Sequence, residues 1–161
     1  MGVGPSTKET TLHHFRDPLL NIVDEDKDID LLGIIIVGTP QDNKEKLFVG
    51  DRVGNLVEAM GAEGAIVSVD GWGNSHVDFA HTIEEIGKKN IPVVGMSFVG
   101  TQGKFVVTNS YMDTIVDFNK SKLGIETEVV GENNVTALDA KKAIGFLKLK
   151  MRNRGNKIWD L

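Results

Sequence analysis

The pattern that most constrains this fold is an alternation of short apolar runs and longer amphipathic stretches over residues 31–99. Residues 31–37 (LLGIIIV) are continuously apolar, which is typical of a parallel strand buried on both faces. Two further runs, at 65–69 and 92–99, are similar, and apolar residues at helical spacing lie between successive runs. This order of strand, helix, strand, helix and strand predicts a parallel sheet with right-handed crossover connections.

The two helices of this alternation have recognisable start and stop signals. Asp42 or Asn43 is expected to cap the first helix, which Gly61 ends. Asn74 or Ser75 is expected to cap the second, and lysines at its C-terminal end complement the helix dipole.

Outside the alternation, two more helices are predicted. Pro18 after Asp17 is typical of a helix start, and Thr136 with Asp139 resembles a capping box that begins a C-terminal helix. Three segments have weaker signals: a fourth strand at 105–107, a short helix or a strand within 111–119, and an edge strand at 125–130.

We therefore expect one α/β domain over residues 1–161, in which residues 1–17 form a polar N-terminal segment. The expected architecture is a three-layer, open, mainly parallel sheet with helices on both faces, of the Rossmann-like or flavodoxin-like kind.

Composition excludes several classes of function. The chain contains no cysteine, so disulfides, Cys-ligated metals and thiol catalysis are excluded within these 161 residues. Its formal net charge of −5 argues against a nucleic-acid partner. No apolar run is long enough to span a membrane and no secretory signal is recognised, so we expect a cytoplasmic protein.

The candidate site lies where the predicted strands end, because ligands of open parallel sheets bind beyond the carboxyl ends of the strands. The segment 70–75 (DGWGNS) places free backbone N–H groups at a helix N-terminus, which favours an anion. A tight turn with Trp72 filling an apolar gap and Asn74 as N-cap explains the same residues equally well. The candidates for substrate or anion binding are Thr39, Asp70, Gly71, Trp72, Gly73, Asn74 and Ser97.

Known motifs narrow the chemistry further. His76 stands where the dinucleotide-binding fingerprint has its third glycine, and no phosphate-binding P-loop is present. His76 and His81 are five residues apart, a poor spacing for a shared helix face, so no metal site is predicted. His13 and His14 remain candidates, since a neutral imidazole exchanges protons near pH 7; simple surface exposure is the alternative.

Several stretches together resemble a known family, the glycine/sarcosine/betaine reductase component B family. The stretches toward the C-terminus resemble its D-proline reductase branch. In chain order the matching stretches are TTLHHFRDPLL (10–20), the apolar run 32–37, GAIVS (64–68), GWGN (71–74), NSYMD (109–113), GEN (131–133) and LKLKM (147–151).

The resemblance implies an oxidoreductase context, the reductive cleavage of a C–N bond. Family members are made as proproteins that cleave at an internal cysteine, which becomes a pyruvoyl group. That group is thought to bind the substrate amine, and a partner subunit with selenocysteine or cysteine completes the reaction. This chain resembles the part that follows the cleavage point, with Gly2 near the position of the cysteine. With no thiol present, the resemblance implies no cofactor in this chain.

The resemblance also implies roles for particular residues. His14 matches a family histidine just after the cofactor segment, which makes it the candidate catalytic residue. The leading hypothesis is a cysteine-free homologue that serves as an accessory or structural component of a proline- or glycine-type reductase complex in amino-acid fermentation. Its expected partners are other reductase subunits or further copies of itself. The alternatives are a substrate-binding component that uses an electrophile from another chain, and a stand-alone small-ligand sensor.

Overall fold

The computed structural model of the chain describes residues 18–69, 73–97, 99, 104–119 and 135–157. Within them, the elements follow one another along the chain as α1 (Pro18–Glu25), α2 (Asn43–Ala59), β1 (Ala65–Ser68), α3 (Ser75–Lys88), β2 (Val93–Ser97), β3 (Ile115–Asp117) and α4 (Ala137–Lys157).

The three strands form one parallel sheet in the order β1-β2-β3. Ala65 pairs with Val93, and Gly95 pairs with Ile115, so β2 is the central strand. Every residue of β2 is buried, as a strand with helices on both of its faces must be. The predicted α/β class and the parallel pairing are confirmed.

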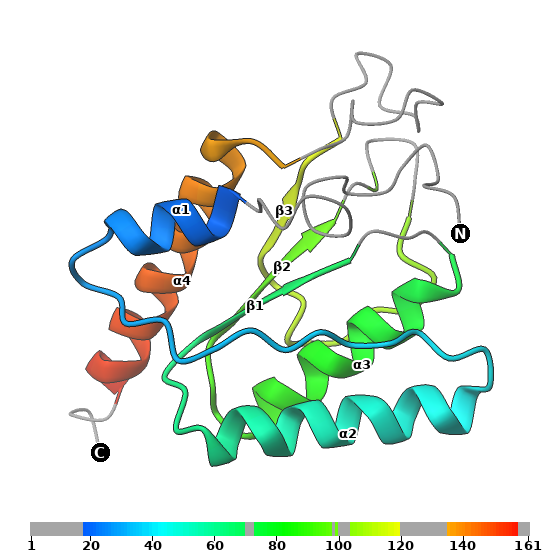
Figure 1. Ribbon diagram of the computed structural model, residues 1–161. Helices are drawn as coiled ribbons and strands as arrows, with labels where there is room; N and C mark the ends of the chain where they lie inside the picture. The colour runs from blue at the N-terminus through cyan, green and yellow to red at the C-terminus, as the bar shows by residue number, and fades with distance from the viewer. Residues whose placement is uncertain (1–17, 70–72, 98, 100–103, 120–134, 158–161) are drawn as a thin grey trace.

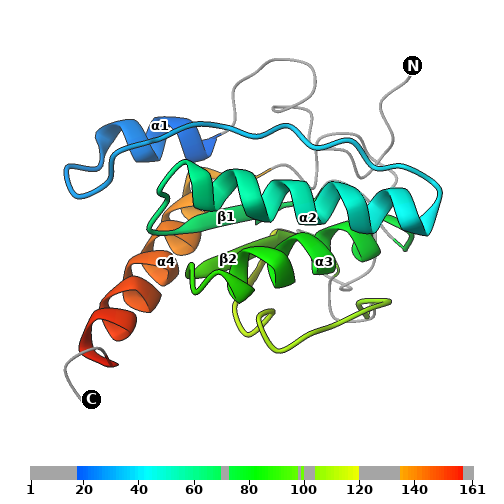
Figure 2. The same ribbon diagram turned by 90° about the horizontal axis from the view of Figure 1, so that it is seen from below.

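The helices lie in layers on the two faces of the sheet (Figure 1). On one face α3 packs against β1 and β2, and α2 runs alongside α3, as the view from below also shows (Figure 2). On the other face α4 contacts all three strands, and α1 packs against α4. Each face has its own buried apolar cluster, one centred on Phe79 and Ile83 of α3 and the other on Ala143 and Leu147 of α4.

The helix starts follow the predicted local chemistry. Asp42 caps α2, and its carboxylate accepts from the backbone N–H groups of Lys44 and Glu45 at 2.8 and 3.3 Å. Thr136 and Asp139 form the predicted capping box, in which the Asp139 carboxylate accepts from the backbone N–H of Thr136 at 2.9 Å.

The prediction of a buried first strand at 31–37 is wrong. These residues form no strand, and Leu31, Leu32, Ile34 and Ile36 are 48%, 52%, 63% and 82% exposed. The segment runs along α2 instead, and only Ile35 and Val37 pack against the core. An apolar run of this kind indicates that a segment is suited to burial. It does not show whether the residues that bury it belong to the same chain.

The weaker predictions had different outcomes. Residues 105–107 form no strand, because Phe105 turns inward onto α3 while Val106 and Val107 are exposed. Of the two options for 111–119, the strand is correct, as β3. The predicted edge strand at 125–130 and the polar segment 1–17 lie outside the described residues.

None of the described helices has the length and apolar character that a membrane span requires.

Candidate functional site

Ser97 ends β2 at the carboxyl edge of the sheet and is completely buried. Its hydroxyl has no hydrogen-bond partner among the described residues. Gly95, two residues earlier and therefore on the same face of the sheet, lies against Phe79 and Ile83 of α3. The Ser97 hydroxyl thus points toward α3, near the end where that helix begins.

His76 lies in the first turn of α3, at the same end of the sheet, and is 2% exposed. Neither ring nitrogen has a hydrogen-bond partner among the described residues. Burial lowers the pKa of His76 from its ordinary value of 6.5, because the apolar surroundings disfavour the charged imidazolium. A neutral imidazole offers one donor and one acceptor, so Ser97 and His76 each present polar atoms that no described residue satisfies, both at this end of the sheet.

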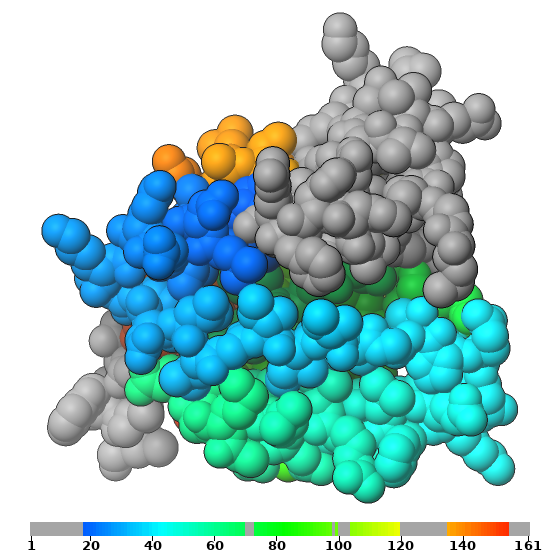
Figure 3. Space-filling model, viewed as in Figure 1, coloured from blue at the N-terminus to red at the C-terminus, as the bar shows by residue number. Residues whose placement is uncertain are grey.

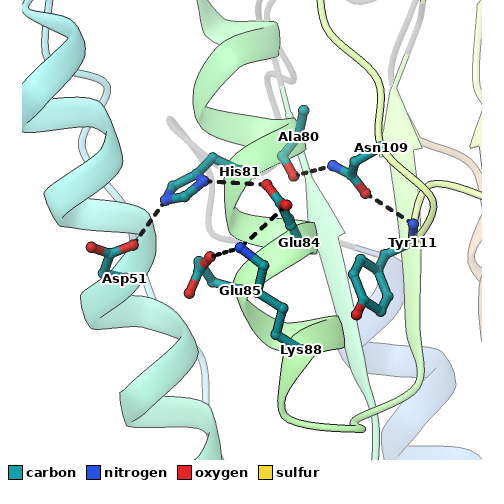
Figure 4. A network of polar contacts seen from close by, with 8 residues as sticks. All are labelled: Asp51, Ala80, His81, Glu84, Glu85, Lys88, Asn109 and Tyr111. Atoms are coloured by element: carbon teal, nitrogen blue, oxygen red, sulfur yellow. Dashed lines mark hydrogen bonds and ion pairs between the residues drawn. The ribbon is translucent and has the colours of Figure 1, made fainter.

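Phe105 covers His76 on one side. The two ring centroids are 4.8 Å apart, and Phe105 also stacks on Phe79 at 5.7 Å. The connection that carries Phe105 is fixed to α3 by Asn109, whose side-chain amide donates to the carbonyl of Ala80 at 2.8 Å (Figure 4).

A buried ion pair joins the first turns of α2 and α3. The Lys46 ammonium donates to the Asp78 carboxylate at 2.5 Å, and the side chains are 0% and 8% exposed. The second carboxylate oxygen of Asp78 has no partner among the described residues. Removing one member would leave the other charge buried and unpaired, which makes this contact a fixed part of the scaffold around the strand ends.

The residues predicted from the sequence are distributed unevenly around this end of the sheet. Ser97 is buried at the end of β2. Asn74 is exposed, makes no side-chain capping bond to α3, and donates to Gln41 at 3.2 Å, which brings it to the loop that carries Thr39. Gly73 has a φ of +63°, a backbone conformation that favours glycine. The remaining candidates lie outside the described residues: His14, Asp70, Gly71 and Trp72.

Sequence reasoning missed three members of this region. Lys46 and Asp78 are 32 residues apart in the chain, so no local pattern links them. His76 was considered only as a metal ligand, although its place on a helix beginning just beyond a predicted strand is a usable signal for a strand-end residue.

A second feature is an apolar face that the described residues leave uncovered. It consists of the exposed side chains of the segment 31–36 together with two residues of α2, namely Leu31, Leu32, Ile34, Ile36, Phe48 and Leu56, which are 48–82% exposed. Figure 3 shows the segment and α2 side by side on one face of the molecule. Patches of this kind are characteristic of interaction surfaces.

The backbone of the segment 31–37 also lacks hydrogen-bond partners among the described residues. Among the described residues, no N–H or C=O group of residues 31–37 takes part in a hydrogen bond. Alternate side chains point in opposite directions, with Ile35 and Val37 toward the core and Ile34 and Ile36 toward solvent. The segment therefore has the form of a strand that lacks a partner.

Comparison with known proteins finds one matching family and two related proteins. The profile of the glycine/sarcosine/betaine reductase component B subunits matches residues 2–155. The chain is 47% identical to the D-proline reductase proprotein of Acetoanaerobium sticklandii over 146 residues, 91% of this chain and 23% of that protein. It is 29% identical to the sarcosine reductase complex component B subunit alpha of Peptoclostridium acidaminophilum over 106 residues, 63% of this chain and 25% of that protein.

The chain thus spans about a quarter of the length of these relatives. No solved structure matches it significantly. The higher identity to the D-proline reductase proprotein agrees with the branch that the C-terminal stretches indicated. The chain belongs to the family of glycine/sarcosine/betaine reductase component B subunits.

Proposed function

We propose that this chain is an accessory or structural component of a D-proline reductase-type complex in amino-acid fermentation in the cytoplasm. The observation that carries the proposal is the uncovered apolar face. Its occupant is the polypeptide that holds the rest of the reductase component, because the relatives are about four times as long as the matched region. A surface that packs against the rest of a long reductase chain is expected to be apolar, as this face is.

The chemistry of the face indicates how that partner binds. Residues 31–37 offer backbone groups that no described residue pairs with, and an extended segment of another chain would satisfy them by strand addition. Phe48 and Leu56 of α2 border a groove beside this segment and would receive the partner's apolar side chains.

The chain supplies no electrophile of its own in this proposal. It has no cysteine, so no cysteine-derived pyruvoyl group forms within these residues. The pyruvoyl group and the selenocysteine or cysteine belong to other subunits. An intact mass equal to that of the translated chain, apart from loss of the first methionine, would agree with this; a mass that reveals internal processing would contradict it.

Binding to the remaining part of the reductase component, produced separately, tests the docking proposal. We expect a complex in light scattering after size-exclusion chromatography. The double variant Ile34→Asp, Ile36→Asp should weaken it by at least about tenfold, because each substitution places a charge in the apolar contact. Leu138→Asp on α4 is the matched control, since Leu138 is 61% exposed and lies outside the apolar face.

Three results would contradict the proposal. One is the absence of any complex, and another is equal binding by the wild type and the double variant. The third is a wild-type homodimer that the double variant abolishes, which would identify the apolar face as a contact between copies of this chain.

A second candidate function is favoured by the strand-end residues. In it the chain binds a small amino or imino acid at Ser97 and His76 and uses an electrophile from another subunit. Calorimetric titration with D-proline, sarcosine, betaine and glycine tests this, with His76→Gln as the variant that should weaken binding. No heat with any of the four, with or without partner subunits, would remove this candidate. Binding without any other reductase chain would instead favour a stand-alone sensor.

A further inference from the structure

Helices α2 and α3 approach each other closely because glycine occupies two successive turns of α2. A Cβ on Gly50 would overlap the imidazole of His81, and one on Gly54 would lie 2.9 Å from the Cβ of Glu85. The two α3 residues are four apart and so share the helix face that meets these glycines. The absence of these two Cβ atoms thus leaves room on α2 for the imidazole of His81 and lets the backbone and Cβ of Glu85 approach closely.

Asp51, next to Gly50, completes a group of three possible metal ligands (Figure 4). Its carboxylate oxygen lies 2.9 Å from His81 Nε2, and one ligand atom from each of Asp51, His81 and Glu85 lies within 4.8 Å of the other two. Ligands bound at about 2.0–2.2 Å to one tetrahedral ion are about 3.3–3.6 Å apart. Small side-chain rotations would bring the three atoms to that spacing.

The second nitrogen of the imidazole has the environment of a metal-bound histidine. His81 Nδ1 faces the carboxylate of Glu84 at 3.6 Å, whereas Nε2 faces Asp51. In metal sites a histidine commonly donates its other N–H to a carboxylate, which fixes the tautomer and orients the ring. Glu84 is therefore placed to orient His81 without being a ligand.

Lys88 currently neutralises part of this acidic cluster. Its ammonium contacts Glu85 at 2.7 Å and Glu84 at 3.2 Å. If Glu85 turned toward an ion, Lys88 would keep Glu84 as its partner. The lysine thus competes for Glu85 but does not block the site.

We propose that Asp51, His81 and Glu85 bind one divalent ion of the zinc type, with a fourth position open to water on the side of the exposed Asp51. One imidazole and two carboxylates form a donor set that suits zinc among the divalent transition metals. The ion would tie α2 to α3 from the outside of the helix pair.

The test is equilibrium dialysis of the full chain against Zn²⁺, with metal content measured by mass spectrometry. We expect one ion per chain, and His81→Gln and Asp51→Asn should each weaken binding by more than about 100-fold, beyond the range typical of losing an outer-shell partner. Glu84→Gln should weaken it by only about 10- to 100-fold, since Glu84 only orients the imidazole. Glu58→Gln is the control, because Glu58 is on α2 and pairs with Lys89 away from the site.

Two controls separate loss of the metal site from misfolding and from binding elsewhere in the chain. Circular dichroism and the metal-free Tm of each variant show whether it folds, and Zn²⁺ should raise the Tm of the wild type and not that of His81→Gln. The double variant His13→Ala, His14→Ala identifies any ion held by the N-terminal imidazoles. The proposal is overturned if no ion binds, if His81→Gln binds as tightly as the wild type, or if binding is lost only in the His13/His14 variant.

Discussion

Two apolar runs of this chain are similar in sequence, but one is buried and the other is largely exposed. The run at 93–97 is the central strand β2, in which Val94, Met96 and Ser97 are completely buried. The run at 31–37 is as apolar and richer in β-branched residues, yet Ile36 is 82% exposed. The difference lies in the surroundings, since β2 has a helix on each face, whereas only Ile35 and Val37 of the other run pack against the core and its opposite side is exposed. Apolar character thus indicates that a segment is suited to burial, and its surroundings determine whether it is buried in this chain.

The sharpest test of this comparison is truncation of one side chain in each run. Met96→Ala should lower the free energy of unfolding by about 2–5 kcal/mol, because it leaves a cavity between the sheet and α4. Ile36→Ala should change it by no more than about 0.5 kcal/mol, because that side chain has little to lose in the isolated chain. Urea denaturation of both variants measures the contrast, and equal losses would show that the segment 31–37 is covered within this chain.

Glycine in each run gives a second, smaller contrast. A Cβ on Gly95 would overlap Ile115 and lie 2.7 Å from Phe79, so Gly95→Ala should cost about 1–3 kcal/mol through overpacking. A Cβ on Gly33 would meet only the terminal methyl of Met60, at 2.9 Å, which a flexible side chain can move away. Gly33→Ala should therefore stay within about 0.5 kcal/mol of the wild type by the same measurement. A larger cost at Gly33 would contradict the loose packing of the exposed run.

The free energy of unfolding should also depend on pH through His76, which is buried in the first turn of α3. Burial lowers the pKa of His76 below 6.5 in the folded chain, so the unfolded chain takes up the proton first as the pH falls. The free energy of unfolding should therefore decrease below about pH 6.5, and His76→Gln should remove that part of the decrease. Denaturation curves between pH 7.5 and 5 measure it, and parallel pH profiles for the two proteins would show that His76 does not contribute.

The smallest effect is expected at the anchor of the exposed run. Lys148 of α4 contacts Asp26 at 2.6 Å and Asp28 at 3.0 Å, just before that run begins. The hydrogen bond from Lys148 is the main reason that the pKa of Asp26 is lowered. Lys148→Met should weaken stability slightly, and 1 M salt should shrink the difference, because partly exposed ion pairs are screened. Hydrogen exchange at 29–37 should rise in the variant; unchanged exchange would show that the anchor does not hold the segment.

Most of the fold was predictable from short-range signals. The start of α2 at Asp42 and of α4 at Thr136 follows from side chains that bond to their own first turn, which is visible in sequence. The short strands β1 and β2 were recognised as continuous apolar runs, and both contact α3 and α4 in the structure. β3 has three residues, too few for a periodicity that separates strand from helix.

Contacts between residues far apart in the chain could not be predicted from the sequence. Val106 and Val107 favour a strand by composition, but Phe105 fixes their segment against α3 and leaves them exposed. At the strand ends, Ser97 and Asn74 were predicted from their place after a strand. Lys46 and Asp78 were not, because their contact crosses 32 residues and joins two helices.

The packing of α1 on α4 has a consequence for how the chain folds. No residue of α1 is buried, and its tie to the rest is α4, which begins more than a hundred residues later. During synthesis from the N-terminus, the surface that α1 binds therefore does not exist until α4 has been made. Closing so long a loop is slow and gains little free energy, so α1 should dock last and detach first.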